Sequence, residues 1–140
     1  MATINATVTI GSDIISGVNI SNTMTMTKAG TNNGLENTTG LNAKTVQTET
    51  AFKLFGNADA TTLKASKVYI RNTGSSPTDF FYIGFGEDLA AATVETIGRL
   101  YGNDWMLIPW DAVAATTHDI YAKSSTAESA MTLEFIAFTE

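Results

Sequence analysis

The fold is decided between residues 67 and 86, which read Lys67-Val68-Tyr69-Ile70-Arg71-Asn72-Thr73-Gly74-Ser75-Ser76-Pro77-Thr78-Asp79-Phe80-Phe81-Tyr82-Ile83-Gly84-Phe85-Gly86. Val68 and Ile70 share one phase of a strand, and the Gly, Ser and Pro residues after them form a strong turn signal. The run from Phe80 to Gly86 is apolar in both phases, as in the centre of a sandwich or beneath a subunit contact. The stretch therefore predicts two strands joined as a hairpin.

The period of two expected of strands recurs on both sides of this stretch. Strand-like segments lie at residues 4–10, 18–26, 44–55, 94–101, 104–109, 118–122 and 131–138. Turn residues separate them every 8 to 15 positions, and no amphipathic helix of three turns is visible. This pattern predicts an all-β, antiparallel β-sandwich of about eight strands, with a jelly roll favoured and an immunoglobulin-like Greek key second.

The length of 140 residues, or 14.9 kDa, suits one domain over residues 1–140. We expect two extensions from it: an N-terminal strand or arm over about residues 1–12, and a long loop over about residues 28–43. Chain ends are free to leave their own domain and pair elsewhere. Two plainer interpretations stay open, in which Ile4, Val8 and Ile10 are ordinary core residues and the loop is a simple surface loop.

The charge balance excludes several classes of partner. The net charge is -6, and only 8 Lys and Arg residues are spread along the chain, so we expect no direct binding to nucleic acid or to a membrane. Cysteine is absent, which excludes disulfides and thiolate chemistry. Thr, Asn and Ser together make 42 of the 140 residues, so uncharged polar side chains replace charge on the surface. That composition suits extended structure and lateral contacts.

No motif indicates catalysis. The single histidine, His118, has no nucleophile elbow to serve, and its neighbour Asp119 would lie on the opposite face of a strand. The acidic pairs Glu87-Asp88 and Asp104…Asp111 match no calcium loop. We therefore predict no catalytic, cofactor-binding or metal-binding residues, no cofactor, and no enzymatic activity.

Aromatic residues form the most informative group near residue 105. Trp105 and Trp110 begin and end the run Trp-Met-Leu-Ile-Pro-Trp, whose apolar side chains occupy both phases, and Tyr101 lies four residues before it. This favours burial in the core or at a subunit contact over a stacking platform for sugar rings, which stays open as the second interpretation.

The segment from Leu63 to Glu140 carries a resemblance to a family. Its successive strands read Lys67-Val68-Tyr69-Ile70-Arg71-Asn72-Thr73, Tyr82-Ile83-Gly84-Phe85-Gly86, Ile97-Gly98-Arg99-Leu100-Tyr101, Asp104-Trp105-Met106-Leu107-Ile108-Pro109-Trp110 and Met131-Thr132-Leu133-Glu134-Phe135. These resemble small all-β structural proteins of tailed bacteriophage virions, especially of marine phages and cyanophages. The resemblance implies a capsid cement or decoration protein, with a minor neck, tail or fibre-associated component as the alternative.

The expected function is therefore non-enzymatic: stabilisation of the phage head by binding across capsid subunit junctions. The expected partners are the major capsid protein, or other virion proteins, and two further copies in a homotrimer; the expected location is the virion, assembled in the host cytoplasm. An alternative of another class is a carbohydrate-binding sandwich for host attachment. The candidate interface residues are Trp105, Trp110, Tyr101, Arg99, Phe81 and Phe138.

Overall fold

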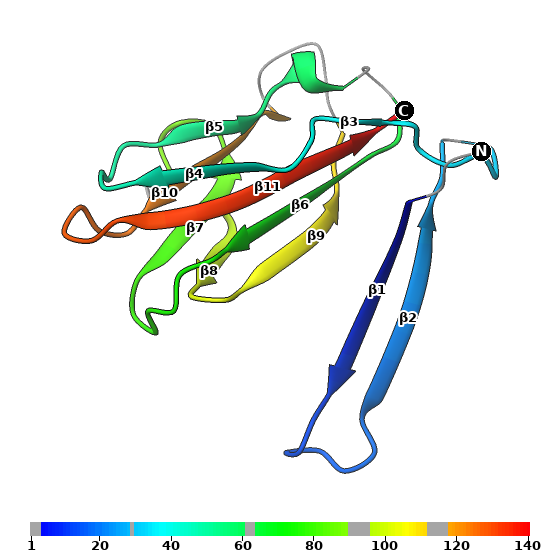
Figure 1. Ribbon diagram of the computed structural model, residues 1–140, viewed down its shortest axis with the longest axis horizontal. Helices are drawn as coiled ribbons and strands as arrows, with labels where there is room; N and C mark the ends of the chain where they lie inside the picture. The colour runs from blue at the N-terminus through cyan, green and yellow to red at the C-terminus, as the bar shows by residue number, and fades with distance from the viewer. Residues whose placement is uncertain (1–3, 29, 61–63, 90–95, 112–117) are drawn as a thin grey trace.

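The computed structural model describes residues 4–28, 30–60, 64–89, 96–111 and 118–140. These residues form strands and one short 3-10 turn, η1 (Asn57–Asp59) (Figure 1). The strands are β1 (Ile4–Gly11), β2 (Asn19–Met26), β3 (Asn37–Thr38), β4 (Asn42–Val46), β5 (Phe52–Phe55), β6 (Ser66–Asn72), β7 (Phe80–Phe85), β8 (Thr96–Tyr101), β9 (Trp105–Pro109), β10 (Ile120–Ser124) and β11 (Met131–Thr139). The prediction of an all-β fold with antiparallel sheets is confirmed.

Two sheets form the body of the molecule. One has the order β5-β10-β7-β8, and the other runs β4-β11-β6-β9, with β3 also paired to β11. The pairing is nested along the chain, because β7 pairs with β8, β6 with β9, β5 with β10 and β4 with β11. Two further pairings, β6 with β11 and β7 with β10, complete the sheets. The chain is thus a long folded ribbon whose successive strand pairs alternate between the two sheets.

The core lies between these sheets and follows from the period of two. In β6 every second side chain is buried, from Ser66 to Asn72, and in β11 Leu133 and Ala137 are fully buried on the same inner side. Phe55 links the layers, with its ring 5.8 Å from that of Trp110 and 5.6 Å from that of Phe135. Burying such large side chains provides the main stabilisation, about 1.5–3 kcal/mol for each.

Two connections differ from those expected. The stretch 67–86 does not form a hairpin, because β6 pairs with β9 and β11 whereas β7 pairs with β8 and β10 in the other sheet. The segment 44–55 likewise divides into β4 and β5, which belong to different sheets. The turn signals were real, but each turn carries the chain across the sandwich instead of back along the same sheet.

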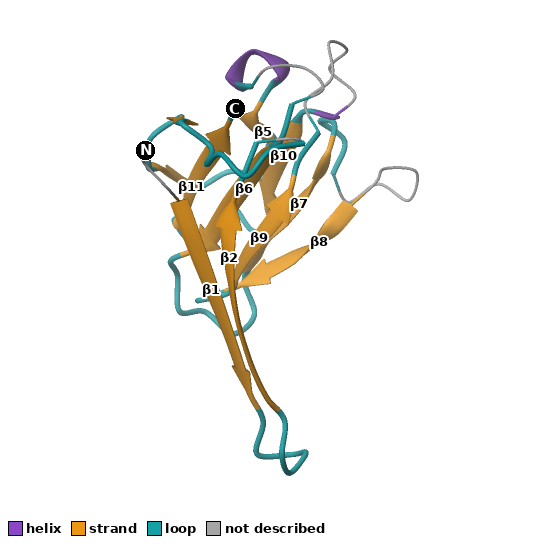
Figure 2. Ribbon diagram, turned by 90° about the vertical axis from the view of Figure 1, so that its right-hand side faces the viewer, coloured by secondary structure: helices purple, strands orange, loops and turns teal. Residues whose placement is uncertain are grey.

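The N-terminal segment forms a hairpin outside both sheets, which we call the arm (residues 4–26). Strands β1 and β2 pair in unbroken register from Ile4↔Met26 to Gly11↔Asn19. Figures 1 and 2 show this hairpin leaving the sandwich near the C-terminus and extending well beyond the other strands. Ile10 is 50% exposed, so it is not a core residue.

The segment that follows the arm is ordered around one buried side chain. Leu35 is fully buried, and its amide donates to the carbonyl oxygen of Met26 at 2.9 Å. Lys28 and Glu36 form an ion pair of 2.9 Å across the same turn. Lys28 and residues 30–36 thus connect the arm to the sandwich, held by these two contacts.

The turn between β8 and β9 supplies a test of the packing. A Cβ atom on Gly102 would lie 2.7 Å from the main-chain carbonyl carbon of Ser75 and 2.7 Å from the carbonyl oxygen of Ser76. Because main-chain atoms cannot move aside cheaply, we expect Gly102→Ala to lower the free energy of unfolding by about 1–3 kcal/mol, measured by urea denaturation. Gly98→Ala in β8 is the matched control, since a Cβ there meets no atom within 4 Å. Equal urea midpoints for the two variants would contradict this packing.

Candidate interaction surfaces

The six predicted interface residues fall into three places. Phe81 is fully buried and Trp110 is 5% exposed, so both are core residues and neither can contact a partner. Phe81 packs edge-on against Phe52, and the Trp110 indole donates to the carbonyl oxygen of His118 at 2.8 Å. The interface prediction for these two residues is corrected accordingly.

Trp105 and Phe138 lie on the outer face of the five-stranded sheet. Among the residues that share this face are the apolar Tyr69, Leu107 and Ile136, because register pairs Tyr69 with both Leu107 and Ile136. The Trp105 ring lies 6.2 Å from that of Tyr69 and is 47% exposed. We call this set, Tyr69, Trp105, Leu107, Ile136 and Phe138, the apolar outer face.

Arg99 and Tyr101 lie on the opposite side of the molecule, on the outer face of the four-stranded sheet. The guanidinium carbon of Arg99 lies 4.8 Å from the ring centre of Phe80 and 5.3 Å from that of Tyr82. Tyr101 packs against Phe80 at 5.0 Å. Stacking of this kind orients a guanidinium group while its edge stays free to bind a carboxylate. Phe80 and Tyr82 were not among the predicted site residues, although the apolar phases of residues 80–85 signalled them.

The proposed sugar platform does not form from Tyr101, Trp105 and Trp110. Trp110 is inside the core, whereas Tyr101 and Trp105 belong to different sheets. The guanidinium of Arg99 also covers the rings nearest to Tyr101. The three aromatic side chains therefore lie in three different places: the core, the outer face of one sheet and the outer face of the other.

The arm has two chemically distinct faces. One face carries hydroxyl and amide side chains that bond across the strands, as between Thr7 and Thr23 at 2.8 Å and between Thr25 and Asn5 at 2.8 Å. The other face carries Ile4, Ala6, Val8, Ile10, Ile20, Met24 and Met26, which we call the arm row, together with one polar residue, Asn22, which pairs with Val8. At the tip, Ile14 is 91% exposed and Ile15 is 61% exposed. An isolated two-stranded hairpin is marginally stable in water, and exposed apolar side chains in such numbers mark a contact surface.

A groove of about 300 Å³ separates the base of the arm from the sandwich. Ile4, Ala6 and Met26 line it from the arm, and four residues of the apolar outer face line it from the sheet: Tyr69, Leu107, Ile136 and Phe138. The arm row is therefore directed toward the apolar outer face where the two meet.

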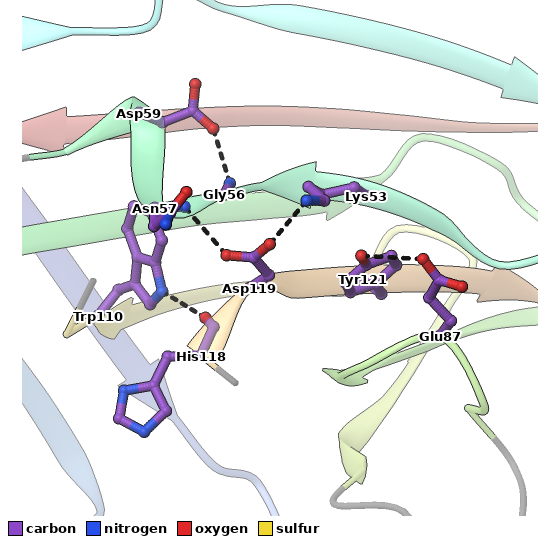
Figure 3. A network of polar contacts seen from close by, with 9 residues as sticks. All are labelled: Lys53, Gly56, Asn57, Asp59, Glu87, Trp110, His118, Asp119 and Tyr121. Atoms are coloured by element: carbon purple, nitrogen blue, oxygen red, sulfur yellow. Dashed lines mark hydrogen bonds and ion pairs between the residues drawn. The ribbon is translucent and has the colours of Figure 1, made fainter. Parts of the chain in front are cut away.

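A polar network closes the end of the sandwich beside η1 (Figure 3). The carboxylate of Asp119, 1% exposed, accepts from the Lys53 amine at 2.7 Å and from the Asn57 amide at 3.0 Å. The hydrogen bond to Asp119 raises the pKa of the Lys53 amine. Burial raises the pKa of the Tyr121 hydroxyl, which donates to Glu87 at 3.2 Å. The network ties η1 and β5 to β10, which is a structural role.

His118 and Asp119 diverge, as predicted for neighbours in an extended chain. The His118 imidazole Nδ1 lies 2.9 Å from the carbonyl oxygen of Asp111, while the Asp119 carboxylate bonds Lys53 and Asn57. Within the described residues, no three His, Cys, Asp or Glu side chains come together as a metal site would require. None of the helical segments described has the length and hydropathy needed to cross a bilayer.

Comparison with known proteins adds no information about function. No protein-family model, no curated protein and no solved structure matches the chain. The functional argument therefore depends on the arm, on the apolar outer face and on the Arg99 cluster.

Proposed function

We propose that the protein is a structural component of a tailed-phage virion, acting as a capsid cement or decoration protein that binds across subunit junctions. The observation that carries this proposal is the arm, a projecting hairpin with one mostly apolar face and two exposed isoleucines, Ile14 and Ile15, at its tip. A clamp needs a rigid body and a segment that reaches a neighbouring subunit. The sandwich supplies the first and the arm the second.

The strand order supports a jelly roll as the finer description of the body. A jelly roll is a double sheet of eight strands built from Greek keys, and viral capsid domains use it. Nested pairing of β4 to β11 with crossing between sheets at each step is the order that such a winding produces. An immunoglobulin-like Greek key would not alternate sheets at every nested pair.

Arg99 is the polar contact that we assign to the capsid partner. Its guanidinium is stacked on Phe80 and Tyr82 and is exposed, so forming a pair with a shell carboxylate costs little side-chain ordering. This contact works by recognition alone, as the proposed non-enzymatic role requires.

Purified heads of the phage that encodes the chain test the proposal. We expect the protein in many copies per head, and heads that lack it should break at a lower temperature until the purified protein is added back. Detection only in necks, tails or fibres would replace cement with the alternative virion role. Absence from the particle would overturn both.

An arm variant locates the function within the chain. Removing residues 7–10 together with 20–23 deletes four register pairs from the middle of the arm. The tip stays, and the remaining side chains keep their original faces, because an even number of residues is removed from each strand. We expect a folded sandwich, with a urea midpoint equal to that of the full-length protein, and at least tenfold weaker binding to heads. Full binding by this shortened variant would show that the arm is not the reaching segment.

A further inference from the structure

We propose that the arm of one copy packs on the apolar outer face of another copy, in a closed ring in which each copy donates one arm and receives one. This inference concerns contact between copies of the chain, and it goes beyond the proposed binding to a capsid. It holds or fails in purified protein, with no shell present.

The base of the arm shows that the two surfaces suit each other. Ile4, Ala6 and Met26 of the arm row line one groove with Tyr69, Leu107, Ile136 and Phe138 of the sheet. Met26 is 2% exposed there, so this part of the row is already covered by its own chain. The arm then diverges from the sandwich, as Figure 1 shows, and the two surfaces separate.

Beyond the base, both halves of the same contact stay open. Ile10, Ile20 and Met24 of the arm row are exposed, as is Trp105 on the sheet. A single chain cannot close the gap between them without bending the arm back. A second copy can close it, because its arm presents the same row to the same sheet surface. Mutual exchange of one donor and one acceptor surface is how identical subunits form closed assemblies.

Charge is also complementary. Residues 4–27 carry a single charged side chain, Asp13, which lies at the tip of the arm. The outer side of β6 carries Lys67 and Arg71, against one acidic residue, Glu134, on the adjacent strand β11. The arm is therefore net negative and the receiving surface net positive, which favours this pairing over contact between two arms.

The exposed apolar residues define the contact that a second copy would cover. On the arm they are Ile10, Ile20 and Met24, with Ile14 and Ile15 at the tip, and on the sheet the exposed residue is Trp105. Each contact joins one arm to one receiving face, so a closed ring has as many contacts as it has copies.

Sedimentation of two variants and their mixture tests the exchange. Ile10→Thr with Ile20→Thr removes the directly paired centre of the arm row and keeps strand propensity. Trp105→Thr disables the receiving face. We expect the wild type to associate at micromolar concentration, and each variant alone to associate at least tenfold more weakly. Mixing the two should give mixed pairs that associate more tightly than either variant does with itself, because the intact arm of one variant fits the intact face of the other. The second contact of each mixed pair stays disabled, so association remains weaker than in the wild type.

The control changes the opposite face of the arm at adjacent pairs. Thr9→Ala with Ser21→Ala removes the 3.4 Å hydroxyl contact and should leave association unchanged. A monomeric wild type at 100 times that concentration overturns the proposal. A mixture that stays as weakly associated as its components also overturns it. Contact between two arms predicts instead that Trp105→Thr associates like the wild type, and contact between two sheet faces predicts that the variant with both isoleucines replaced does so.

Discussion

Replacing Trp110 with alanine should lower the free energy of unfolding by about 3–5 kcal/mol. The indole ring is 5% exposed and packs 5.8 Å from the ring of Phe55, so its removal leaves a cavity where the two sheets meet. The substitution also leaves the carbonyl oxygen of His118 without the indole N–H that it accepts at 2.8 Å. Urea denaturation followed by circular dichroism measures the loss.

Trp105→Ala is the matched control for this prediction. It removes the same side chain from the outer face of β9, where the ring is 47% exposed and contacts Tyr69. We expect a loss of no more than about 1 kcal/mol in a single copy, because little buried volume is lost. Equal losses in the two variants would mean that Trp110 does not occupy the core.

The contrast between the two tryptophans shows where sequence reasoning ended. Trp105 and Leu107 point to the outer side of β9, whereas Ile108, and Trp110 just past the end of the strand, point to its inner side. Alternation therefore predicts that the two tryptophans face opposite ways. Since both phases are apolar, nothing in the sequence indicates which phase faces the core. The answer depends on β6, whose inner Val68 pairs with Ile108.

Strands were predictable because alternation is a local property, whereas strand partners were not. The run Phe80–Gly86 was correctly expected to be a strand, yet its partners are β8 and β10 and not the preceding β6. A turn rich in Gly, Ser and Pro reverses the chain equally well within a sheet and between two sheets. The nested order depends on closing contacts such as β4 with β11, which are far apart in sequence.

The candidate surfaces, like the strand partners, were only partly predictable from the sequence. Arg99 is exposed and Trp105 lies on an outer face, which their sequence neighbours allowed but did not require. The arm was expected as a single strand over about residues 1–12. It is a hairpin because residues 19–26 repeat the same alternation, so that Ile20 and Met24 extend the row of Ile10 and Ala6. The sequence shows the alternation of both strands, but alternation alone does not indicate that the two strands pair with each other.

Asn72 should be the most sensitive polar residue of the core. Its side chain is fully buried, donates to the carbonyl oxygen of Leu100 at 3.0 Å and accepts from the Gly74 amide at 2.9 Å. It thereby joins β6 in one sheet to β8 in the other. We expect Asn72→Leu to lower the free energy of unfolding by about 2–4 kcal/mol, because the buried carbonyl of Leu100 and the partly buried amide of Gly74 lose their partner.

Asn72→Asp affects the two hydrogen bonds differently, and the pH dependence of stability reports the difference. The carboxylate keeps the acceptor for Gly74 but faces the carbonyl oxygen of Leu100 without a donor, in a buried site. Burial and this carbonyl should raise the pKa of the new carboxyl group above its unfolded value of about 3.9. A raised pKa in the folded state means that the variant is most stable below that value and loses stability as pH rises. Urea midpoints at pH 4 and pH 7 should therefore differ more for Asn72→Asp than for the wild type, with the larger deficit at pH 7. A deficit that is equal at both pH values, or larger at pH 4, would show that this side chain does not bridge the sheets through its amide.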